Sequence, residues 1–192
     1  MNRRASLAAA VAVSALAVAA VAPRFIKLSS AEAASPAVAI KAAAELVGPR
    51  GVRFGTATLD ESPRGVLIRV HARGLPAGRH GFHVHAVGDC GDAEFKRAGG
   101  HLHGGGASVH GLLNPQATDT GDLPNLVVSA DGRLDAEVFT SFVTLGGAGD
   151  RQNLLDKDGA ALILHANADD HVTQPIGGAG ARIACAVIKP SR

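Results

Sequence analysis

Aromatic side chains are scarce in this 192-residue sequence, which has no tryptophan, no tyrosine and six phenylalanines. The sequence also lacks a block of basic residues. Proteins that bind nucleic acids need aromatic rings on which bases stack and cationic patches that neutralise phosphates. Both shortages therefore exclude nucleic acid as the expected partner. The length favours one domain with its own core.

The N-terminal segment differs from the rest of the chain. Two arginines precede an apolar run over residues 5–22, and Ala-Glu-Ala follows at 31–33. A positive start, an apolar run and a small-residue cleavage site are typical of a secretory signal peptide. We therefore expect residues 1–34 to be a signal peptide or N-terminal anchor. Residues 35–192 would then be one exported domain, periplasmic or extracellular.

Retention of this segment as a membrane anchor is the alternative, because the apolar run approaches the roughly 20 residues of a spanning helix. Arg24 and Lys27 also separate the run from the cleavage site. Arg3 and Arg4 permit a twin-arginine export route. Contact with a membrane is expected only if the segment is retained. Its removal changes the formal net charge from +2 to −1, because it holds four cationic side chains and one acidic one.

Cysteine is nearly absent, since Cys90 and Cys185 are the two in the chain. After an export signal, an isolated pair is more often bridged than free, because the compartment is oxidising. We therefore expect one disulfide. In the chain-entropy account, closing so long a loop stabilises the fold by about 4 to 5 kcal/mol.

Apolar residues recur at every second position in much of the remaining chain, which predicts half-buried strands. Strands are expected over 38–46, 52–54, 66–70, 82–84, 126–129, 134–139, 160–165 and 182–188. Asp131-Gly132 predicts a hairpin turn that joins 126–129 to 134–139. Short strands at hairpin spacing indicate an all-β sandwich or barrel.

Two segments interrupt this alternation. Between Gly88 and Leu123 glycine, histidine and aspartate replace most apolar residues, and a second irregular segment covers 166–181. Loops this long are usually functional or disordered. Histidines at positions 101, 103 and 110 favour function for the first of them. No internal repeat is evident.

His83 and His85 are expected side by side on one face of their strand, because strand side chains alternate between faces. Two neutral imidazoles suit copper or zinc, and intrinsic affinity favours copper. The pair alone is more typical of two surface histidines, or of histidines whose nitrogens are satisfied by hydrogen bonds, than of a metal site. His101, His110 and His165 lie in or beside the irregular segments and could complete a multi-histidine centre. A hydrolytic zinc enzyme is disfavoured, because no glutamate near these motifs is placed as a general base.

Five segments, in order, resemble motifs of the copper/zinc superoxide dismutases: 81–85, 99–101, 121–124, 164–166 and 178–185. The resemblance covers roughly residues 37–189. It implies an all-β fold, an eight-stranded Greek-key β-barrel or sandwich with long metal-binding and active-site loops. It also implies an enzyme that converts superoxide to oxygen and hydrogen peroxide at a copper centre.

The same resemblance assigns the copper ligands. His83, His85 and His165 resemble three of them, and His101 resembles the histidine that bridges copper to zinc. The family mechanism implies that His101 leaves reduced copper and passes a proton to the nascent peroxide. Arg182 resembles the active-site arginine, whose permanent charge can attract and orient a small anion such as superoxide.

Two supporting features follow from the resemblance as well. Cys90 and Cys185 match the disulfide partners of the family, so the bridge would support the strand that presents Arg182. Asp169 resembles the carboxylate that hydrogen-bonds metal-bound histidines and thereby fixes their tautomers. The neighbouring Asp170 is the alternative for this role.

The zinc half departs from the family pattern. His101, His110 and Asp122 match three zinc ligands, but Asp119 stands where the family has a fourth ligand, a histidine. Asp119 can still bind, because zinc accepts carboxylate oxygen. A weakened zinc site is the alternative. His103, where the family usually has another residue, could substitute for the missing ligand or simply be exposed.

Two rival functions stay open from the sequence. An exported copper carrier or buffer would use the same barrel without appreciable turnover, and an adhesive sandwich would hold no stoichiometric metal. Arg182 and the four implied copper ligands favour the enzyme. Segment 166–181 has no lysine or arginine, so attraction of superoxide is expected to depend on Arg182 and the metal charge. No apolar stripe indicates a dimer interface, so the oligomeric state is open.

Overall fold

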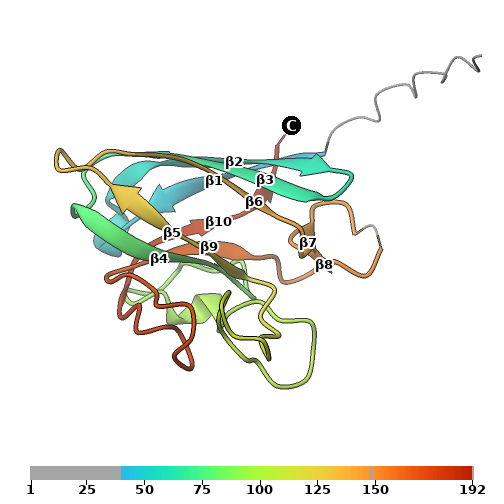
Figure 1. Cartoon of the computed structure of the whole chain (residues 1–192). Helices are drawn as coiled ribbons and strands as arrows, with labels where there is room; N and C mark the ends of the chain where they lie inside the picture. The colour runs from blue at the N-terminus through green and yellow to red at the C-terminus, as the bar shows by residue number, and fades with distance from the viewer. Residues whose placement is uncertain (1–39, 148, 192) are drawn as a thin grey trace, which may run out of the picture. The chain divides into compact units, whose positions relative to one another are not determined.

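The computed structural model describes residues 40–147 and 149–191 as strands joined by long loops (Figure 1). The strands are β1 (Lys41–Val47), β2 (Arg53–Ser62), β3 (Gly65–Ala72), β4 (Gly78–His85), β5 (Asp122–Val128), β6 (Leu134–Thr140), β7 (Val143–Thr144), β8 (Gln152–Asn153), β9 (Ala161–His165), β10 (Arg182–Val187) and β11 (Lys189–Pro190). Two 3-10 turns, η1 (Pro49–Gly51) and η2 (Lys96–Ala98), are the helical elements of these residues. The expected leader, 1–34, lies outside them.

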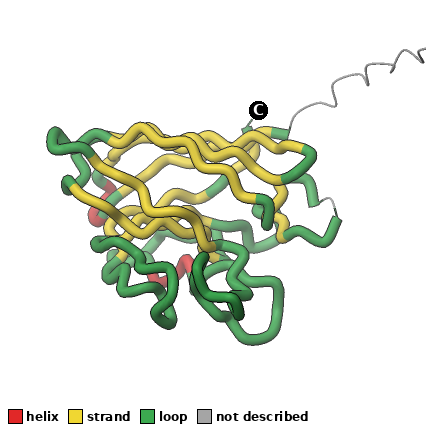
Figure 2. Tube along the Cα trace, viewed as in Figure 1, coloured by secondary structure: helices red, strands yellow, loops and turns green. Residues whose placement is uncertain are grey.

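Eight strands of the main sheet follow the order β5-β4-β9-β10-β1-β2-β3-β6, and β11 is a ninth that pairs with β1; all neighbours are antiparallel. β5 and β6, at the two ends of this path, also lie next to each other. The sheet therefore curls into a nearly closed barrel (Figure 2). β3 and β4 are consecutive but do not pair, so their connection crosses the barrel end, as in a Greek key. The expected all-β barrel is confirmed.

The barrel interior is filled as the alternation predicts. In β1 every second residue is buried, beginning at Ala42, and β6 shows the same pattern from Leu134. Leu59, Ile68 and Leu162 have no exposed surface. Each side chain of this size contributes about 1.5–3 kcal/mol when it leaves water. The alternating residues therefore supply the core on which the loops are mounted.

β4 differs from the half-buried strand that its sequence predicts. All of its residues from His80 onward are buried, on both faces. Phe82 and Val84 face the barrel core, while the long loops cover the other face. Val84 exchanges backbone hydrogen bonds with Leu102 and Gly121, and Gly81 donates to Asn167. Figures 1 and 2 show these loops gathered beside β4 and β9.

The predicted hairpin after β5 is partly wrong. A tight turn is present, because Gly132 donates to the Ser129 carbonyl at 2.9 Å. The strands that it joins do not pair, however: β5 pairs with β4 and β6 with β3. A groove separates their facing edges. The turn depends on local residues, whereas strand pairing depends on neighbours contributed by distant segments. These neighbours, β4 and β3, place β5 and β6 on opposite sides of the groove.

No helix within residues 40–147 and 149–191 has the length and hydrophobicity needed to cross a membrane.

Candidate metal centre

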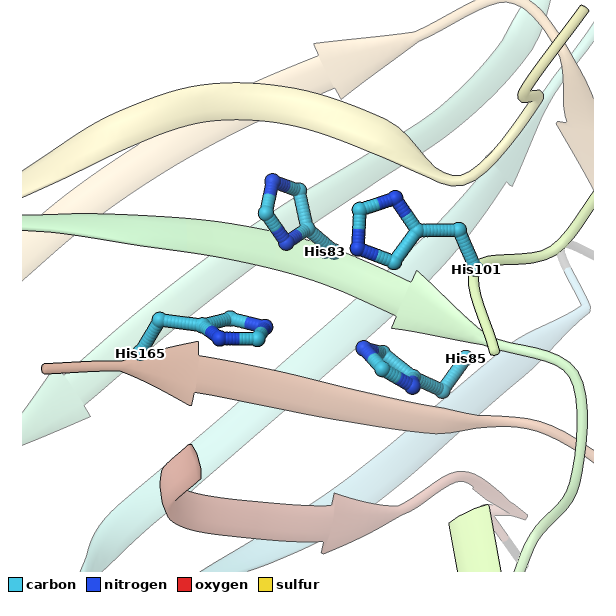
Figure 3. A group of neighbouring side chains, drawn as sticks. All are labelled: His83, His85, His101 and His165. Atoms are coloured by element: carbon cyan, nitrogen blue, oxygen red, sulfur yellow. The ribbon is translucent and has the colours of Figure 1, made fainter. Parts of the chain in front are cut away.

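Four histidines meet on the outer face of the barrel. His83 and His85 project from β4, and the neighbouring β9 ends at His165. The loop after β4 returns alongside that strand, so His101 forms an isolated bridge with His85. Figure 3 shows the four rings gathered around a common centre. We call these residues the four-histidine cluster.

The geometry of the four-histidine cluster suits a single ion. One ring nitrogen from each residue lies within 4.8 Å of those of the other three. The ring centroids of His83 and His101 are 4.0 Å apart, and those of His83 and His165 are 4.9 Å apart. None of the four residues is more than 5% exposed. Sequence segments far apart are therefore brought together as expected.

Each ring in this cluster has one nitrogen tied to the protein and one left over. His85 Nδ1 donates to the Gly99 carbonyl at 2.9 Å, and His165 Nδ1 donates to the Gly180 carbonyl at 3.0 Å. His83 Nε2 donates to Asp169 Oδ2 at 2.8 Å. A carbonyl oxygen only accepts, so each of these contacts fixes which nitrogen carries the proton.

The remaining nitrogens have no hydrogen-bond partner among the described residues: His83 Nδ1, His85 Nε2, His101 Nε2 and His165 Nε2. A buried polar atom without a partner costs about 1–3 kcal/mol. Four such nitrogens at one point are what a metal ion would satisfy, and an all-imidazole set suits copper or zinc. The residues present therefore fit the implied metal.

Burial keeps three of these imidazoles neutral. It lowers the pKa of His83 below 6.5 and lowers that of His85 further. Burial also lowers the pKa of His165 to about 3. A metal ion needs an unprotonated ring nitrogen. Because the pKa values are lowered, each of these three rings already has one at neutral pH, and no proton has to be displaced from it.

A second group, the mixed cluster, shares two of these histidines: His83, His101, His110 and Asp122 also place ligand atoms within 4.8 Å of one another. His101 Nδ1 lies 3.0 Å from Asp122 Oδ1, and His110 Nδ1 donates to the same oxygen at 2.8 Å. The Gly111 backbone N–H donates to Asp122 Oδ2 at 2.7 Å. The two clusters are therefore adjacent, with His83 and His101 in both.

The pKa of His110 is shifted in the direction opposite to those of His83, His85 and His165. Burial alone would lower its pKa, but its two ring nitrogens face Asp122 and Asp169, and these carboxylates raise it to about 10. Burial opposes ionisation of Asp122, yet hydrogen bonds from His101 and His110 outweigh it and hold its pKa below the ordinary value. A zinc ion would replace the proton on His110 Nδ1, since metal binding and protonation compete for that lone pair.

Asp119 lies at the edge of the mixed cluster. Its side chain is fully buried, and Oδ2 is 3.4 Å from His101 Nδ1. Oδ1 accepts from Ser108 Oγ at 2.6 Å, while Oδ2 has no hydrogen-bond partner in the described part of the chain. His103 forms an isolated bridge with Asp119, but it belongs to neither cluster of described residues.

Asp169 joins the two clusters, whereas Asp170 faces away. Asp169 Oδ2 accepts from His83 Nε2 at 2.8 Å, and Oδ1 accepts from His110 Nε2 at 3.0 Å. Burial opposes its ionisation, but these bonds lower its pKa strongly. Asp170 is exposed and accepts from the Val172 backbone N–H. Of the two carboxylates, the structure places Asp169 against the histidines.

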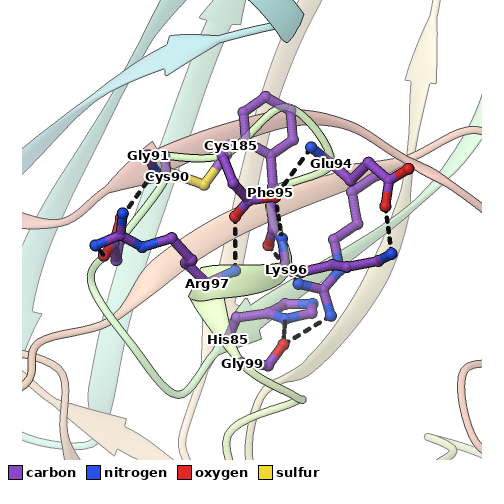
Figure 4. Close-up of a disulfide and its surroundings, with 12 residues drawn as sticks. His85, Cys90, Gly91, Glu94, Phe95, Lys96, Arg97, Gly99 and Cys185 are labelled. Atoms are coloured by element: carbon purple, nitrogen blue, oxygen red, sulfur yellow. Dashed lines mark hydrogen bonds and ion pairs between the residues drawn. A yellow bond between two sulfur atoms is a disulfide. The ribbon is translucent and has the colours of Figure 1, made fainter.

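The expected disulfide is confirmed, since Cys90 and Cys185 are bonded across 95 residues (Figure 4). Arg182, three residues before Cys185 on β10, pairs with His165 on β9. Arg182 is half-buried, donates to the Phe95 carbonyl and donates to the Gly99 carbonyl at 2.7 Å. Burial lowers its pKa below the ordinary value, but a guanidinium remains charged in proteins.

The sequence reasoning missed Lys96, which lines the same surface pocket as Arg182. Lys96 is contributed by η2, in the loop that the disulfide closes, and it forms an ion pair with Glu94 (Figure 4). The sequence analysis looked for cationic residues only in segment 166–181, which does not contain Lys96. The expected disulfide could have indicated it, because Cys90 lies near Lys96 in the sequence and Cys185 lies near Arg182.

An antiparallel β-barrel with two adjacent clusters of histidine and aspartate defines a metalloprotein built to hold two ions. The family described as copper/zinc superoxide dismutase (SODC) matches residues 53–188, and the chain belongs to this family. It is therefore an oxidoreductase, a superoxide dismutase that uses copper and zinc.

Known relatives agree with this assignment. The chain is 54% identical over 139 residues to a superoxide dismutase [Cu-Zn] of Caulobacter vibrioides, a match that covers 72% of this chain and 80% of that protein. The crystal structure of a SOD-like protein from Bacillus subtilis aligns with a TM-score of 0.70 at 38% identity, covering 75% and 95% of the two chains. Cu/Zn superoxide dismutase from Brucella abortus aligns at 0.62 and 30% identity, covering 78% and 99%. The two rival functions, a copper carrier and a metal-free sandwich, have no comparable support.

Proposed function

We propose that the four-histidine cluster holds the catalytic copper and that His101 faces zinc through its other nitrogen. The observation that carries this proposal is the convergence of four buried nitrogens without hydrogen-bond partners among the described residues. Elemental analysis should give one copper per chain, and the copper-loaded protein should consume superoxide faster than an equal amount of free copper. Copper uptake without faster consumption would leave a binding protein rather than an enzyme.

The residues around the cluster divide the remaining work. Copper, when bound, supplies reversible one-electron transfer, which zinc cannot. Arg182 attracts superoxide and orients it, since its guanidinium is held by two backbone carbonyls and carries a permanent charge. His101 can hold a proton at Nε2 and pass it to the departing peroxide. Asp122 keeps the ring of His101 oriented meanwhile, through the contact at Nδ1.

Arg182→Ala is expected to lower kcat/KM for superoxide by about 10-fold or more, because focused positive charge raises the association rate of small anions by that order. Copper content should not change, since the side chain contacts carbonyls rather than ring nitrogens. Stopped-flow rates at low and high salt measure the effect, which should shrink with salt. Arg97→Ala, at an exposed ion pair with Asp89, is the matched control. Equal rates for Arg182→Ala and wild type would contradict the assigned role.

For zinc we propose His101, His110, Asp122 and Asp119. Supporting Asp119 is its buried Oδ2, which has no partner in the described residues and lies beside the mixed cluster. Two histidine nitrogens and two carboxylate oxygens make an ordinary zinc shell. The departure from the family pattern would then change the ligand atom and keep the site.

Asp119→Ala is expected to weaken zinc binding by more than about 100-fold, because one of four ligands that share a large binding free energy is lost. Asp119→His should bind zinc at least as tightly as wild type does, since it restores the usual family residue. Competition with a chromophoric chelator measures both affinities. His103→Ala is the control and should bind zinc like wild type. If His103→Ala loses zinc and Asp119→Ala keeps it, then His103 is the fourth ligand.

We propose that residues 1–34 direct export and that residues 35–192 are the mature enzyme, periplasmic or extracellular. The charge and hydrophobicity pattern of the segment supports this, and so does a buried disulfide, which persists in oxidising compartments. Mass spectrometry of protein from the periplasmic fraction should find a mature N-terminus near residue 35. An intact N-terminus in the membrane fraction would indicate an anchor instead.

The metal-free protein is expected to be most stable near pH 6.5 to 7. Below this pH, His83, His85 and His165 take up protons in the unfolded chain but stay unprotonated in the folded chain, because folding lowers their pKa values. Stability therefore falls as the pH drops through 6.5. Above it, His110, with its pKa raised to about 10, keeps a proton that the unfolded chain loses. Its contribution is complete below 6.5 and disappears as the pH rises toward 10.

Thermal unfolding in a chelating buffer tests this profile. We expect the midpoint to drop by about 5 °C at pH 5 and again at pH 9, since each kcal/mol shifts the midpoint by roughly 2–4 °C at this size. His110→Gln should flatten the alkaline limb alone. In the same buffer without the chelator, added zinc should flatten the alkaline limb too, because the ion replaces that proton. A midpoint that rises steadily from pH 6.5 to 10 would contradict the assignment.

A further inference from the structure

A third histidine, His171, lies against the Asp169 carboxylate. Its backbone N–H donates to Asp169 Oδ1 at 2.6 Å, and its ring Nδ1 is 3.2 Å from Oδ2. The backbone of His171 is in the left-handed region, with φ of 63°. Non-glycine residues seldom adopt this conformation, although histidine is among those that adopt it more readily, and such backbones gather at functional sites. This turn brings both the backbone and the ring of His171 onto the carboxylate two residues earlier.

Asn125, on β5, sets the direction of the hydrogen bonds around His171. Its Oδ1 accepts from the Asp169 backbone N–H at 2.8 Å, a contact in which only the backbone can donate. Nδ2 of Asn125 is therefore correctly placed as the donor. It donates to the Asp169 carbonyl at 2.8 Å and to His171 Nε2 at 3.1 Å.

The protonation of His171 follows from that direction. Since Asn125 donates to Nε2, that nitrogen offers its lone pair, and the single N–H of a neutral imidazole must be at Nδ1. Nδ1 is buried and forms no hydrogen bond with the described residues, although Asp169 Oδ2 lies 3.2 Å away. The Asp169 carboxylate is therefore the group toward which we expect that hydrogen to be directed.

With His171 in place, the Asp169 carboxylate is fully occupied. Oδ1 accepts from His110 Nε2 and from the His171 backbone, and Oδ2 accepts from His83 Nε2 and faces His171 Nδ1. A carboxylate has about four lone-pair directions. Three are used by hydrogen bonds and the fourth faces His171 Nδ1, so rotation of the carboxylate away from His83 or His110 would break bonds to both the side chain and the backbone of its neighbours.

We propose that His171 is a positioning residue, a neutral Nδ1–H donor oriented by Asn125, that keeps Asp169 bonded to His83 and His110 at the same time. The inference rests on the proposed function in one respect, that these two histidines serve the copper and zinc sites. By holding Asp169 still, His171 keeps the protons of both rings at Nε2. Both Nδ1 lone pairs then stay directed at the metals. Asn125 and His171 thus couple β5 to segment 166–181 behind the site.

The first test needs no substitution. In the zinc-loaded, copper-free protein, nitrogen NMR of the histidine rings should show His171 protonated at Nδ1 and unprotonated at Nε2. His83 and His110 should be protonated at Nε2. A His171 ring protonated at Nε2 would overturn the proposal, whatever the variants below do.

The second test compares zinc affinities by chelator competition. His171→Gly keeps the left-handed backbone and its N–H but removes the ring, and it should bind zinc about 10-fold more weakly, the effect usual for lost outer partners of ligands. His171→Asn tolerates the same backbone and carries an amide N–H near the position of Nδ1, so it should recover most of that affinity. Val172→Ala, at the exposed neighbour, should match wild type.

These results separate the inference from the function beneath it. Wild-type affinity in His171→Gly, or no recovery in His171→Asn, would refute the positioning role while leaving the ligand assignment intact. If wild type itself takes up no zinc and Asp169→Ala behaves identically, the ligand assignment fails instead. The ring protonation of His171, measured also without metal, would then still decide its own role.

Discussion

His83→Ala is expected to abolish superoxide dismutation, with kcat/KM falling by more than about 100-fold, because losing even an outer partner of a metal ligand costs 10- to 100-fold. His83 belongs to both clusters and also donates to Asp169. Its ring lies 4.0 Å from that of His101 and 4.9 Å from that of His165. Removing it takes away a copper ligand and also one of the two histidines bonded to Asp169, the carboxylate that contacts His110, so zinc binding should weaken together with copper binding.

Copper and zinc per chain, measured with the superoxide consumption rate on the same sample, test this expectation. His71→Ala is the matched control, because His71 is exposed on β3 and pairs with Asp135 on the neighbouring strand. It should keep the metal content and the rate of wild type. A His83→Ala protein with full copper content and normal turnover would contradict the four-histidine copper site.

The second large effect concerns the disulfide. Cys185→Ser is expected to lower the free energy of unfolding by about 4 kcal/mol, since the bond closes a loop of some 95 residues in the unfolded chain. Cys185 is fully buried and packs with Phe95, Ala98 and Ile163. The serine would bury a hydroxyl in this apolar cluster, which adds to the loss.

Activity should fall as well, because the bridged loop carries the carbonyls of Phe95 and Gly99 that hold Arg182. Urea unfolding with and without reductant measures the stability term, and wild type under reduction should approach the variant. Copper content should remain that of wild type at temperatures where the variant is folded. Equal unfolding midpoints for oxidised wild type and Cys185→Ser would show that the bond contributes nothing.

The alternation of apolar residues was sufficient to predict where most strands lie, but not whether one or both faces of a strand are buried. The expected strand over 66–70 lies within β3, and 134–139 within β6, each with alternating burial. β4 follows the same local pattern yet is buried on both faces, because the long loops fold over its histidines. The hairpin from β5 to β6 was wrong for a related reason, since its turn is local and its pairing is not.

The candidate site shows the same division. The spacing of His83 and His85 was enough to place them on one face. The strained left-handed backbones of Phe95 and His171 could not be foreseen. One supplies a carbonyl to Arg182, and the other contacts Asp169. Non-glycine residues carry no local sign of positive φ, because the surrounding packing imposes it.

The sequence by itself determined the strand period, the pairing of the two cysteines and the kinds of ligand atom, because these follow from residue type and from local backbone geometry. Tertiary structure alone decided which ring nitrogen of each histidine is left without a hydrogen bond, which of Asp169 and Asp170 contacts the histidines, and that Lys96 lines the same pocket as Arg182. The reason is distance along the chain. His83 owes its tautomer to an aspartate 86 residues away, and only folding brings such a partner within hydrogen-bond reach.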